Sequence, residues 1–113
     1  MARGKIVLVP WGYDDSDAYK VRPCVCLTNP KGKIKHIIVA FITSSGNREF
    51  NTDIVIDESH PEFGITGLKQ TSTIRLHKMM TFVESEIQRE LGKIPKDIQK
   101  EINKTLLDMF ELQ

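Results

Sequence analysis

The longest apolar run in the chain, which decides its fold, is residues 34–43, IKHIIVAFIT. A run of this length predicts the central strand of a sheet. Shorter strand-like segments lie before and after it, at residues 5–10, 22–28, 52–56, 72–77 and 79–83. Short segments rich in Gly, Pro, Asn, Asp and Ser separate them, and six strands at this spacing predict a small antiparallel β-barrel.

The period of the apolar residues changes from that of a strand to that of a helix near residue 84. Residues 84–90 are predicted to form two helical turns that end at Gly92, and Pro95 stands where a further helix would begin. Beyond it an amphipathic helix of about four turns is expected to pack one face on the barrel. Its apolar positions are Ile98, Ile102, Leu106 and either Met109 or Phe110. At 113 residues the chain is interpreted as one α+β domain over residues 1–113.

The composition narrows the class of protein. Lys and Arg number 16 and Asp and Glu 15, a net charge of +1, which excludes a strongly basic nucleic-acid coat. The charges divide into a net +3 over residues 1–83 and a net −2 over residues 84–113, so a polyanion site is expected in the first part. No apolar stretch approaches the ~18 residues of a membrane-spanning helix, and the N-terminus lacks signal-peptide features. We therefore expect a soluble, cytoplasmic protein without membrane contact.

Cys24 and Cys26 are two residues apart in a predicted strand, so their side chains point the same way. A disulfide between them would distort the strand, and neither a second cysteine pair nor clustered histidines complete a zinc site. The pattern predicts two buried, reduced thiols, with a redox or metal role as the alternative.

Arg22 begins a predicted strand directly before Pro23. A guanidinium held at a strand end can present its fork to a phosphate, and the alternative is an ion pair with Asp14, Asp15 or Asp17. Thr43, Ser44 and Ser45 end the central strand before Gly46, where hydroxyls and free N–H groups suit a phosphate cradle. The alternative there is a turn with hydroxyl caps.

Further polar positions lie at the entrance to the late strand and along it. Gln70, Thr71 and Ser72 form the entrance, and Arg75 and His77 then share a strand face, a pair suited to a phosphodiester. The alternative for His77 is an ordinary surface histidine. In the first loop Trp11 and Tyr13 can either stack on bases or pack the loop onto the barrel.

In this order the segments resemble the PemK/MazF family of bacterial toxins. The resemblance rests on GKIVLVPW, KVRPCVCLTNP, IIVAFITSS, GLKQTSTIRLHKMMTFV and LGKIPKDIQKEINKTLLDMFEL, which together cover nearly the whole chain. Its most specific features are Arg22-Pro23, the strand end at Thr43-Ser44, and Gly67-Leu68 leading to Ser72.

The resemblance implies an SH3-like antiparallel barrel with C-terminal helices that works as a homodimer. It also implies a metal-independent, cofactor-free endoribonuclease that cuts single-stranded mRNA at short sequences and is inhibited by a cognate antitoxin. Arg22 and Thr43 match the family's main catalytic residues, with RNA contacts expected at Trp11, Ser44, Gln70, Thr71, Ser72 and Arg75.

His77 stands where some family members have a carboxylate, so the identity of the general base is open. An imidazole with an unperturbed pKa of ~6.5 can fill that role, and His77 is our candidate. Two other functions fit the same barrel: a gyrase-poisoning toxin and a non-enzymatic SH3-like binding module. Arg22 with Thr43 favours the nuclease, because the gyrase poison needs no phosphate-handling pair.

Overall fold

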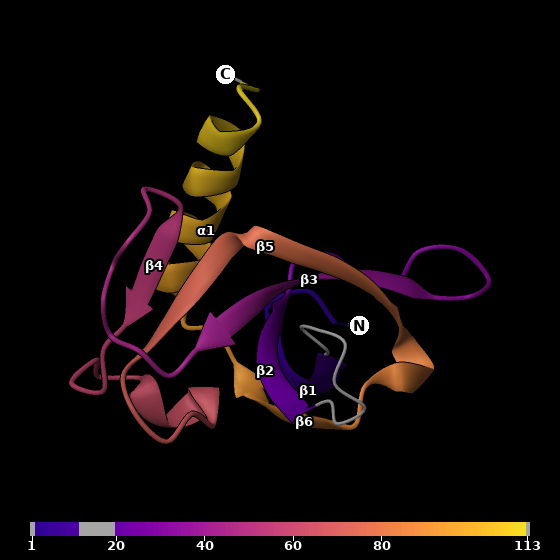
Figure 1. The fold of residues 1–113 in the computed structure, drawn as a ribbon, viewed down its shortest axis with the longest axis horizontal. Helices are drawn as coiled ribbons and strands as arrows, with labels where there is room; N and C mark the ends of the chain where they lie inside the picture. The colour runs from indigo at the N-terminus through magenta and orange to yellow at the C-terminus, as the bar shows by residue number, and fades with distance from the viewer. Residues whose placement is uncertain (1, 12–19, 113) are drawn as a thin grey trace.

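A computed structural model describes residues 2–11 and 20–112, with the side chains of residues 11 and 20 left aside. Six strands form one antiparallel sheet in the order β4-β5-β3-β2-β1-β6, curled into a half-barrel (Figure 1). The strands are β1 Lys5–Trp11, β2 Lys20–Cys26, β3 His36–Thr43, β4 Asp53–Ile56, β5 Ser72–Val83 and β6 Arg89–Lys93. Two 3₁₀ turns, η1 Phe63–Thr66 and η2 Glu84–Glu86, precede the C-terminal helix α1, Lys96–Met109. The predicted small antiparallel β-barrel with a helical C-terminus is confirmed.

β3 is the interior strand that the long apolar run predicted, paired with β2 on one side and β5 on the other. It begins at His36 rather than at residue 34, because the β2–β3 hairpin turns at residues 32–35. The two ends of that turn, Gly32 and Lys35, both have a positive φ.

The two late strands predicted at residues 72–77 and 79–83 are one continuous strand, β5. Arg75 pairs with Phe41 while Met79 pairs with Ala40, so residues 76–78 are additional on the β5 side of the ladder. Extra residues in one strand of a pair bend it and increase its twist. The bend lets β5 pair with β4 through its first half and with the start of β3 through its second half.

The helix predicted over residues 84–90 is wrong. Only Glu84–Glu86 make a 3₁₀ turn, and Arg89–Lys93 form β6, which pairs with β1 at the edge of the sheet. Gly92 lies inside this strand, and a Cβ there would stand 2.2 Å from the Ile65 carbonyl oxygen. Backbone pairing with a distant strand has overridden the local helical preference of this segment.

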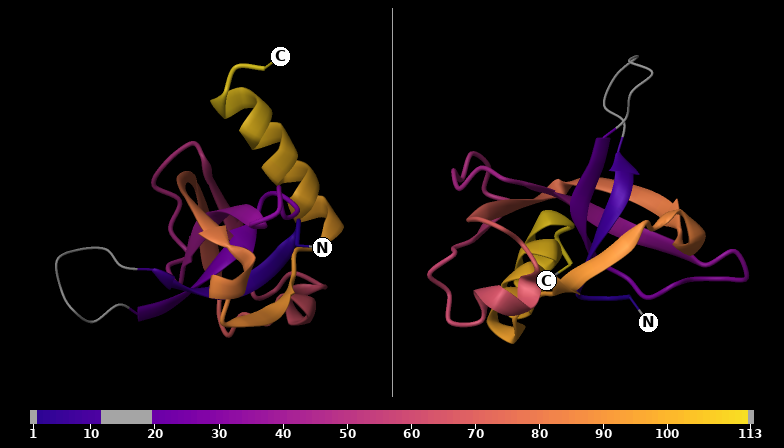
Figure 2. Two further views of the ribbon diagram at one scale, coloured as in Figure 1. Left: turned by 90° about the vertical axis from the view of Figure 1, so that its right-hand side faces the viewer. Right: turned by 90° about the horizontal axis from the view of Figure 1, so that it is seen from below.

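The sheet carries an apolar core on each face. One core contains Ile42, Ile74 and Leu76 and is covered by α1 through Ile98 and Ile102, as the amphipathic pattern predicted (Figure 2). Leu106 and Met109 also pack against this core, whereas Phe110 is 56% exposed. In the described part of the chain, no helix is long and apolar enough to cross a membrane.

The second core lies within the curl of the sheet and contains both cysteines. Cys24 and Cys26 are buried, free thiols, as predicted. Burial raises the pKa of Cys26 to about 11 and also raises the pKa of Cys24, so both are held as neutral thiols.

Candidate active site

A cleft of about 500 Å³ opens where β2, β3 and β5 meet the segment after η1. Five predicted site residues line it together: Arg22, Thr43, Ser44, Gln70 and Ser72. Apolar side chains, among them Leu8, Leu68 and Leu91, line other parts of the cleft. Residues separated by up to 50 positions in the sequence are therefore gathered at one site.

The sheet register places Arg22 and Thr43 on the same face, and both line the cleft. Cys24 pairs with Phe41, and Arg22 and Thr43 each lie two residues further along their strands, so these four side chains share one face of the sheet. Residues directly opposite each other in an antiparallel pair project to the same face. Thr43 in turn pairs with Thr73 on β5, so this face extends across three strands.

Arg22 contributes to the cleft a guanidinium with one buried donor that is left without a partner among the described residues. Its Nε is buried and, among the described residues, has no hydrogen-bond partner. A buried donor without an acceptor is costly, and a guanidinium is best satisfied by a carboxylate or phosphate. The alternative partners predicted for it, Asp14, Asp15 and Asp17, lie outside the described residues.

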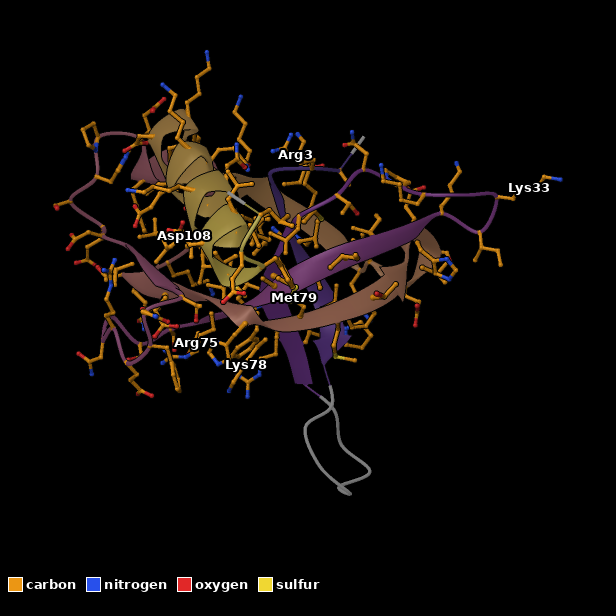
Figure 3. All side chains as sticks on the ribbon, turned by 90° about the horizontal axis from the view of Figure 1, so that it is seen from above. Arg3, Lys33, Arg75, Lys78, Met79 and Asp108 are labelled. Atoms are coloured by element: carbon orange, nitrogen blue, oxygen red, sulfur yellow. The ribbon has the colours of Figure 1, made fainter. Side chains whose placement is uncertain are left out.

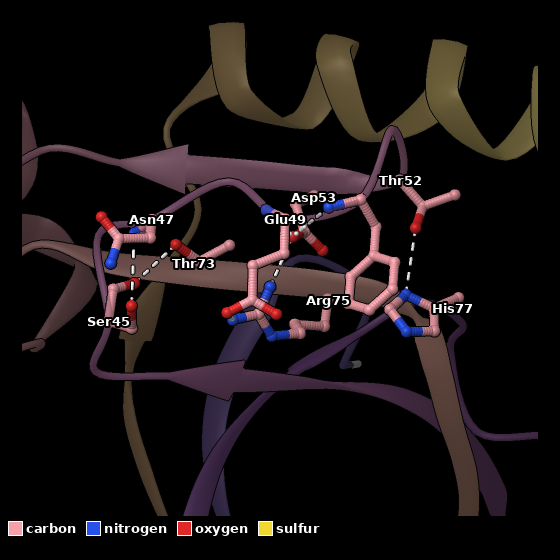
Figure 4. Close-up of polar contacts among 9 residues, drawn as sticks. Ser45, Asn47, Glu49, Thr52, Asp53, Thr73, Arg75 and His77 are labelled. Carbon is pink, nitrogen blue, oxygen red and sulfur yellow. Dashed lines mark hydrogen bonds and ion pairs between the residues drawn. The ribbon is translucent and has the colours of Figure 1, made fainter.

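Hydrogen bonds from β5 and its entrance fix the loop that follows Thr43. Gln70 Nε2 donates to the Ser44 carbonyl at 2.9 Å, and Thr73 Oγ1 donates to the Ser45 carbonyl at 2.5 Å. The Ser45 hydroxyl accepts the Asn47 N–H at 3.2 Å, the hydroxyl-capped turn that was the alternative interpretation (Figure 4). The carbonyls are thus turned toward β5, and the Thr43 and Ser44 side chains remain on the cleft.

The entrance residues divide between the cleft and the neighbouring loop. The Ser72 hydroxyl donates to the Gln70 carbonyl at 2.8 Å, which shapes the cleft wall. Thr71 does not line the cleft, because its hydroxyl accepts the Glu58 N–H at 2.9 Å and its own N–H donates to the Glu58 carboxylate. A direct contact of Thr71 with RNA stays a prediction.

Arg75 lies outside the cleft, with its guanidinium buried against acids (Figure 4). It forms an ion pair with the buried Asp53 carboxylate and a second one, at 3.6 Å, with Glu49. The same Asp53 oxygen accepts the backbone N–H groups of Glu49 and Phe50 at 2.9 Å. Arg75 and Asp53 therefore hold the loop between β3 and β4 in place.

His77 is exposed and also lies outside the cleft. Its Nδ1 shares a hydrogen bond with Thr52 Oγ1 at 3.0 Å, and its ring centroid is 4.5 Å from that of Phe50. It shares the β5 face with Arg75, as predicted. Of the first loop, Trp11 ends β1 but its side chain is not described, and Tyr13 lies outside the described residues.

Sequence reasoning missed two cations that line the cleft, Lys69 and Arg89. Arg89 was assigned to the wrong helix, and only the pairing of Leu8 with Arg89 brings it to the site. Lys69 carried no distinguishing signal beyond its place next to Gln70. In residues 2–11 and 20–112, no three His, Cys, Asp or Glu side chains are grouped so that they could hold a metal ion.

The sequence profile of the PemK-like, MazF-like toxins of type II toxin–antitoxin systems matches residues 2–110. The chain belongs to this toxin family. A comparison with curated protein sequences finds no significant match.

Solved structures of mycobacterial toxins share the fold of this PemK/MazF-like toxin. An endoribonuclease in complex with its cognate antitoxin, from a mycobacterial species, superposes with a TM-score of 0.75 at 16% identity. That match covers 100% of this chain and 97% of the other. The Mycobacterium tuberculosis toxin MazF-mt6 gives a TM-score of 0.71 at 20% identity, over 96% and 98% of the two chains. At these identities the likeness establishes the fold.

Proposed function

We propose that this toxin is a sequence-specific, metal-independent endoribonuclease that cleaves single-stranded RNA to a 2′,3′-cyclic phosphate and a 5′-hydroxyl. PemK/MazF-like toxins are generally endoribonucleases. The observation that carries the proposal here is the buried Nε of Arg22, which has no hydrogen-bond partner among the described residues, in a cleft that Thr43 also lines. A phosphodiester would supply an anionic oxygen to this donor, for which the described residues provide no acceptor.

The nucleophile in this mechanism belongs to the RNA. The 2′-OH attacks the adjacent phosphorus in line, the bond to the 5′-oxygen breaks, and negative charge builds on the non-bridging oxygens. In this proposal Arg22 and the Thr43 hydroxyl, which both line the cleft, bind those oxygens more strongly in the transition state. Lys69 and Arg89, at the same cleft, add positive potential for the flanking phosphates.

Two proton transfers complete the reaction, one from the 2′-OH and one to the leaving 5′-oxygen. His77 is the sequence-based candidate for the base, but its position beside Phe50 and Thr52, away from the cleft, favours a role in holding RNA. The pH profile of His77→Ala decides between these roles. If His77 is the base, His77→Ala should lower the cleavage rate by roughly 10²–10⁴-fold and change its dependence on pH. If His77 only contacts the RNA, the pH dependence of cleavage should stay the same.

The partners belong to the proposal as well. A neighbour in structure is bound to its cognate antitoxin, so we expect an antitoxin to bind this toxin too. We also expect a homodimer in the cytoplasm, because one small half-barrel with an open cleft has little surface with which to enclose RNA. Light scattering at micromolar concentration measures the assembly.

The deciding experiment incubates the purified toxin with a long single-stranded RNA in EDTA and identifies the new ends. Cleavage should persist, and the 5′ ends should accept phosphate from a kinase without prior dephosphorylation. Arg22→Ala should lower the rate by about 10²–10³-fold, as expected for a lost oxyanion contact. Arg48→Ala is the matched control, because Arg48 is an exposed arginine that does not line the cleft and pairs with Glu101 at 3.6 Å.

Ends that carry a 5′-phosphate, or activity that disappears with EDTA, would contradict the proposed chemistry. The gyrase-poisoning alternative predicts no RNA cleavage and a loss of DNA supercoiling activity, and a binding module predicts neither. Assaying the same preparation on RNA and on gyrase separates the three functions.

A further inference from the structure

Two aromatic side chains stand together on β5 and the loop before β4, outside the cleft. Phe50 is 46% exposed, and the neighbouring His77 is also exposed. Their ring centroids are 4.5 Å apart and their planes are tilted by 57°. The pair leaves part of its aromatic surface open to solvent.

Both rings are held in place by interactions with the fold. The Phe50 N–H donates to the buried Asp53 carboxylate at 2.9 Å, and the Arg75 guanidinium carbon lies 5.8 Å from the Phe50 ring centroid. His77 is restrained by its 3.0 Å hydrogen bond with Thr52. A ligand that stacks here therefore loses little affinity to ordering the protein.

The aromatic pair lies on the same sheet face as the catalytic candidates. Thr73 pairs with Thr43, and Arg75 pairs with Phe41, so the side chains at 73 and 75 share the face of Thr43. The Phe50 ring contacts both Arg75 and His77, which brings the aromatic pair to the same face. Thr73 and His77 are four residues apart on β5, at most about 13 Å along a strand. Figure 3 shows Arg75 on the side of the sheet opposite α1, where this face is uncovered by the helix.

The chemistry of this position selects a planar, uncharged group. The Arg75 guanidinium is already paired with Asp53 and Glu49, so it offers no free positive charge to a phosphate. Glu49, 59% exposed, would repel one. The faces of aromatic rings stack readily on nucleobases, with little dependence on base identity.

We propose that Phe50 and His77 form a platform on which one nucleobase of the RNA stacks, near the scissile phosphate held in the cleft. This inference rests on the proposed function, since it names a second contact of the same RNA. It assigns Phe50, which carried no signal in the sequence, to substrate binding, and it makes His77 a positioning residue.

The test measures binding separately from cleavage, with a fluorescent RNA that is 2′-O-methylated throughout and so lacks the nucleophile. Phe50→Ala should bind this RNA about 5- to 100-fold more weakly, the usual effect of removing one stacking contact. Phe50→Trp, which keeps an aromatic ring, should bind the RNA about as tightly as the wild type. His77→Ala should bind it more weakly, as Phe50→Ala does. Phe110→Ala is the matched control, because Phe110 is an exposed phenylalanine at the far end of α1 and should leave binding unchanged.

A single abasic nucleotide moved along the RNA identifies the stacked base. At one position the abasic nucleotide should weaken RNA binding by the wild type but should not weaken binding by Phe50→Ala any further, because both changes remove the same interaction. Equal abasic penalties in both proteins at every position would overturn the platform. So would an effect of Phe50→Ala on antitoxin binding alone, which would mark a protein contact. Binding that depends on Phe50 without any cleavage of ordinary RNA would keep the platform and refute the nuclease.

Discussion

Gly92→Ala tests whether the contact between β6 and η1 holds the wall of the cleft. A Cβ at Gly92 would lie 2.2 Å from the Ile65 carbonyl oxygen and 2.5 Å from the Thr66 carbonyl carbon. Both are backbone atoms, so no rotamer change can relieve the clash. To reach the 3.4 Å at which ordinary contact begins, η1 would have to move by about 1.2 Å.

This displacement should affect both stability and activity. Overpacking of this kind costs about 1–3 kcal/mol, and we expect the upper end because backbone must move. Residues 67–70, directly after η1, line the cleft, and Gln70 donates to the Ser44 carbonyl. A misplacement of about 1 Å in such a wall can lower kcat/KM by roughly 10²-fold.

Gly64→Ala is the matched control within η1, because a Cβ at Gly64 meets no atom within 4 Å. It should change the free energy of unfolding by less than about 0.5 kcal/mol and leave cleavage intact. Urea unfolding and RNA cleavage are measured on both variants. If Gly92→Ala is as stable and as active as Gly64→Ala, the close approach of β6 to η1 does not shape the site.

Three other predictions follow from side-chain contacts. Asp53→Asn leaves the buried Arg75 guanidinium without its charged partner and should cost about 3–5 kcal/mol in urea unfolding, whereas Glu49→Gln, at an exposed pair, should cost less than about 1 kcal/mol. With a pKa of about 11, Cys26 is only about one-thousandth thiolate at pH 8, so iodoacetamide should label it in urea but not in the native protein. A hydrogen bond from the His60 imidazole lowers the pKa of Asp97 below its ordinary value of 3.8. The ionised Asp97 carboxylate therefore stabilises the fold at pH values above 3.8, and this stabilisation disappears as the pH falls through the lowered pKa of the folded state. In thermal melts, the melting temperature of Asp97→Asn should therefore decrease less at acidic pH than that of the wild type.

The parts of the fold that were predicted from sequence are those with a strong local pattern. The apolar run around β3 and the helical period of α1 mark buried surfaces directly. β6 carries no such pattern: RELGK has one large apolar residue, and its partner β1 lies more than 80 residues earlier. Pairing between strands so far apart in the sequence produces no pattern among neighbouring residues, so the sequence around residues 89–93 indicates a helix instead of a strand.

The same distinction applies to the site. Arg22 and Thr43 could be proposed from the sequence because each adjoins an end of a predicted apolar run, although β2 in fact begins at Lys20 and Arg22 is its third residue. Arg75 could not be assigned correctly to a buried pair, because its partner Asp53 lies 22 residues away and a charge within a strand usually indicates an exposed face. Phe50 was missed because a single aromatic residue in a polar loop reveals nothing of the side chains beside it.

The order of the strands has a consequence for how this protein behaves at high concentration. The two edge strands are the shortest in the sheet, with β4 four residues long and β6 five. β6 also carries the charged side chains of Arg89, Glu90 and Lys93. An incoming strand from another molecule would find few free backbone groups at either edge and would meet unfavourable charge at one of them. Short and charged edges of this kind are features by which sheet proteins limit edge-to-edge pairing between molecules.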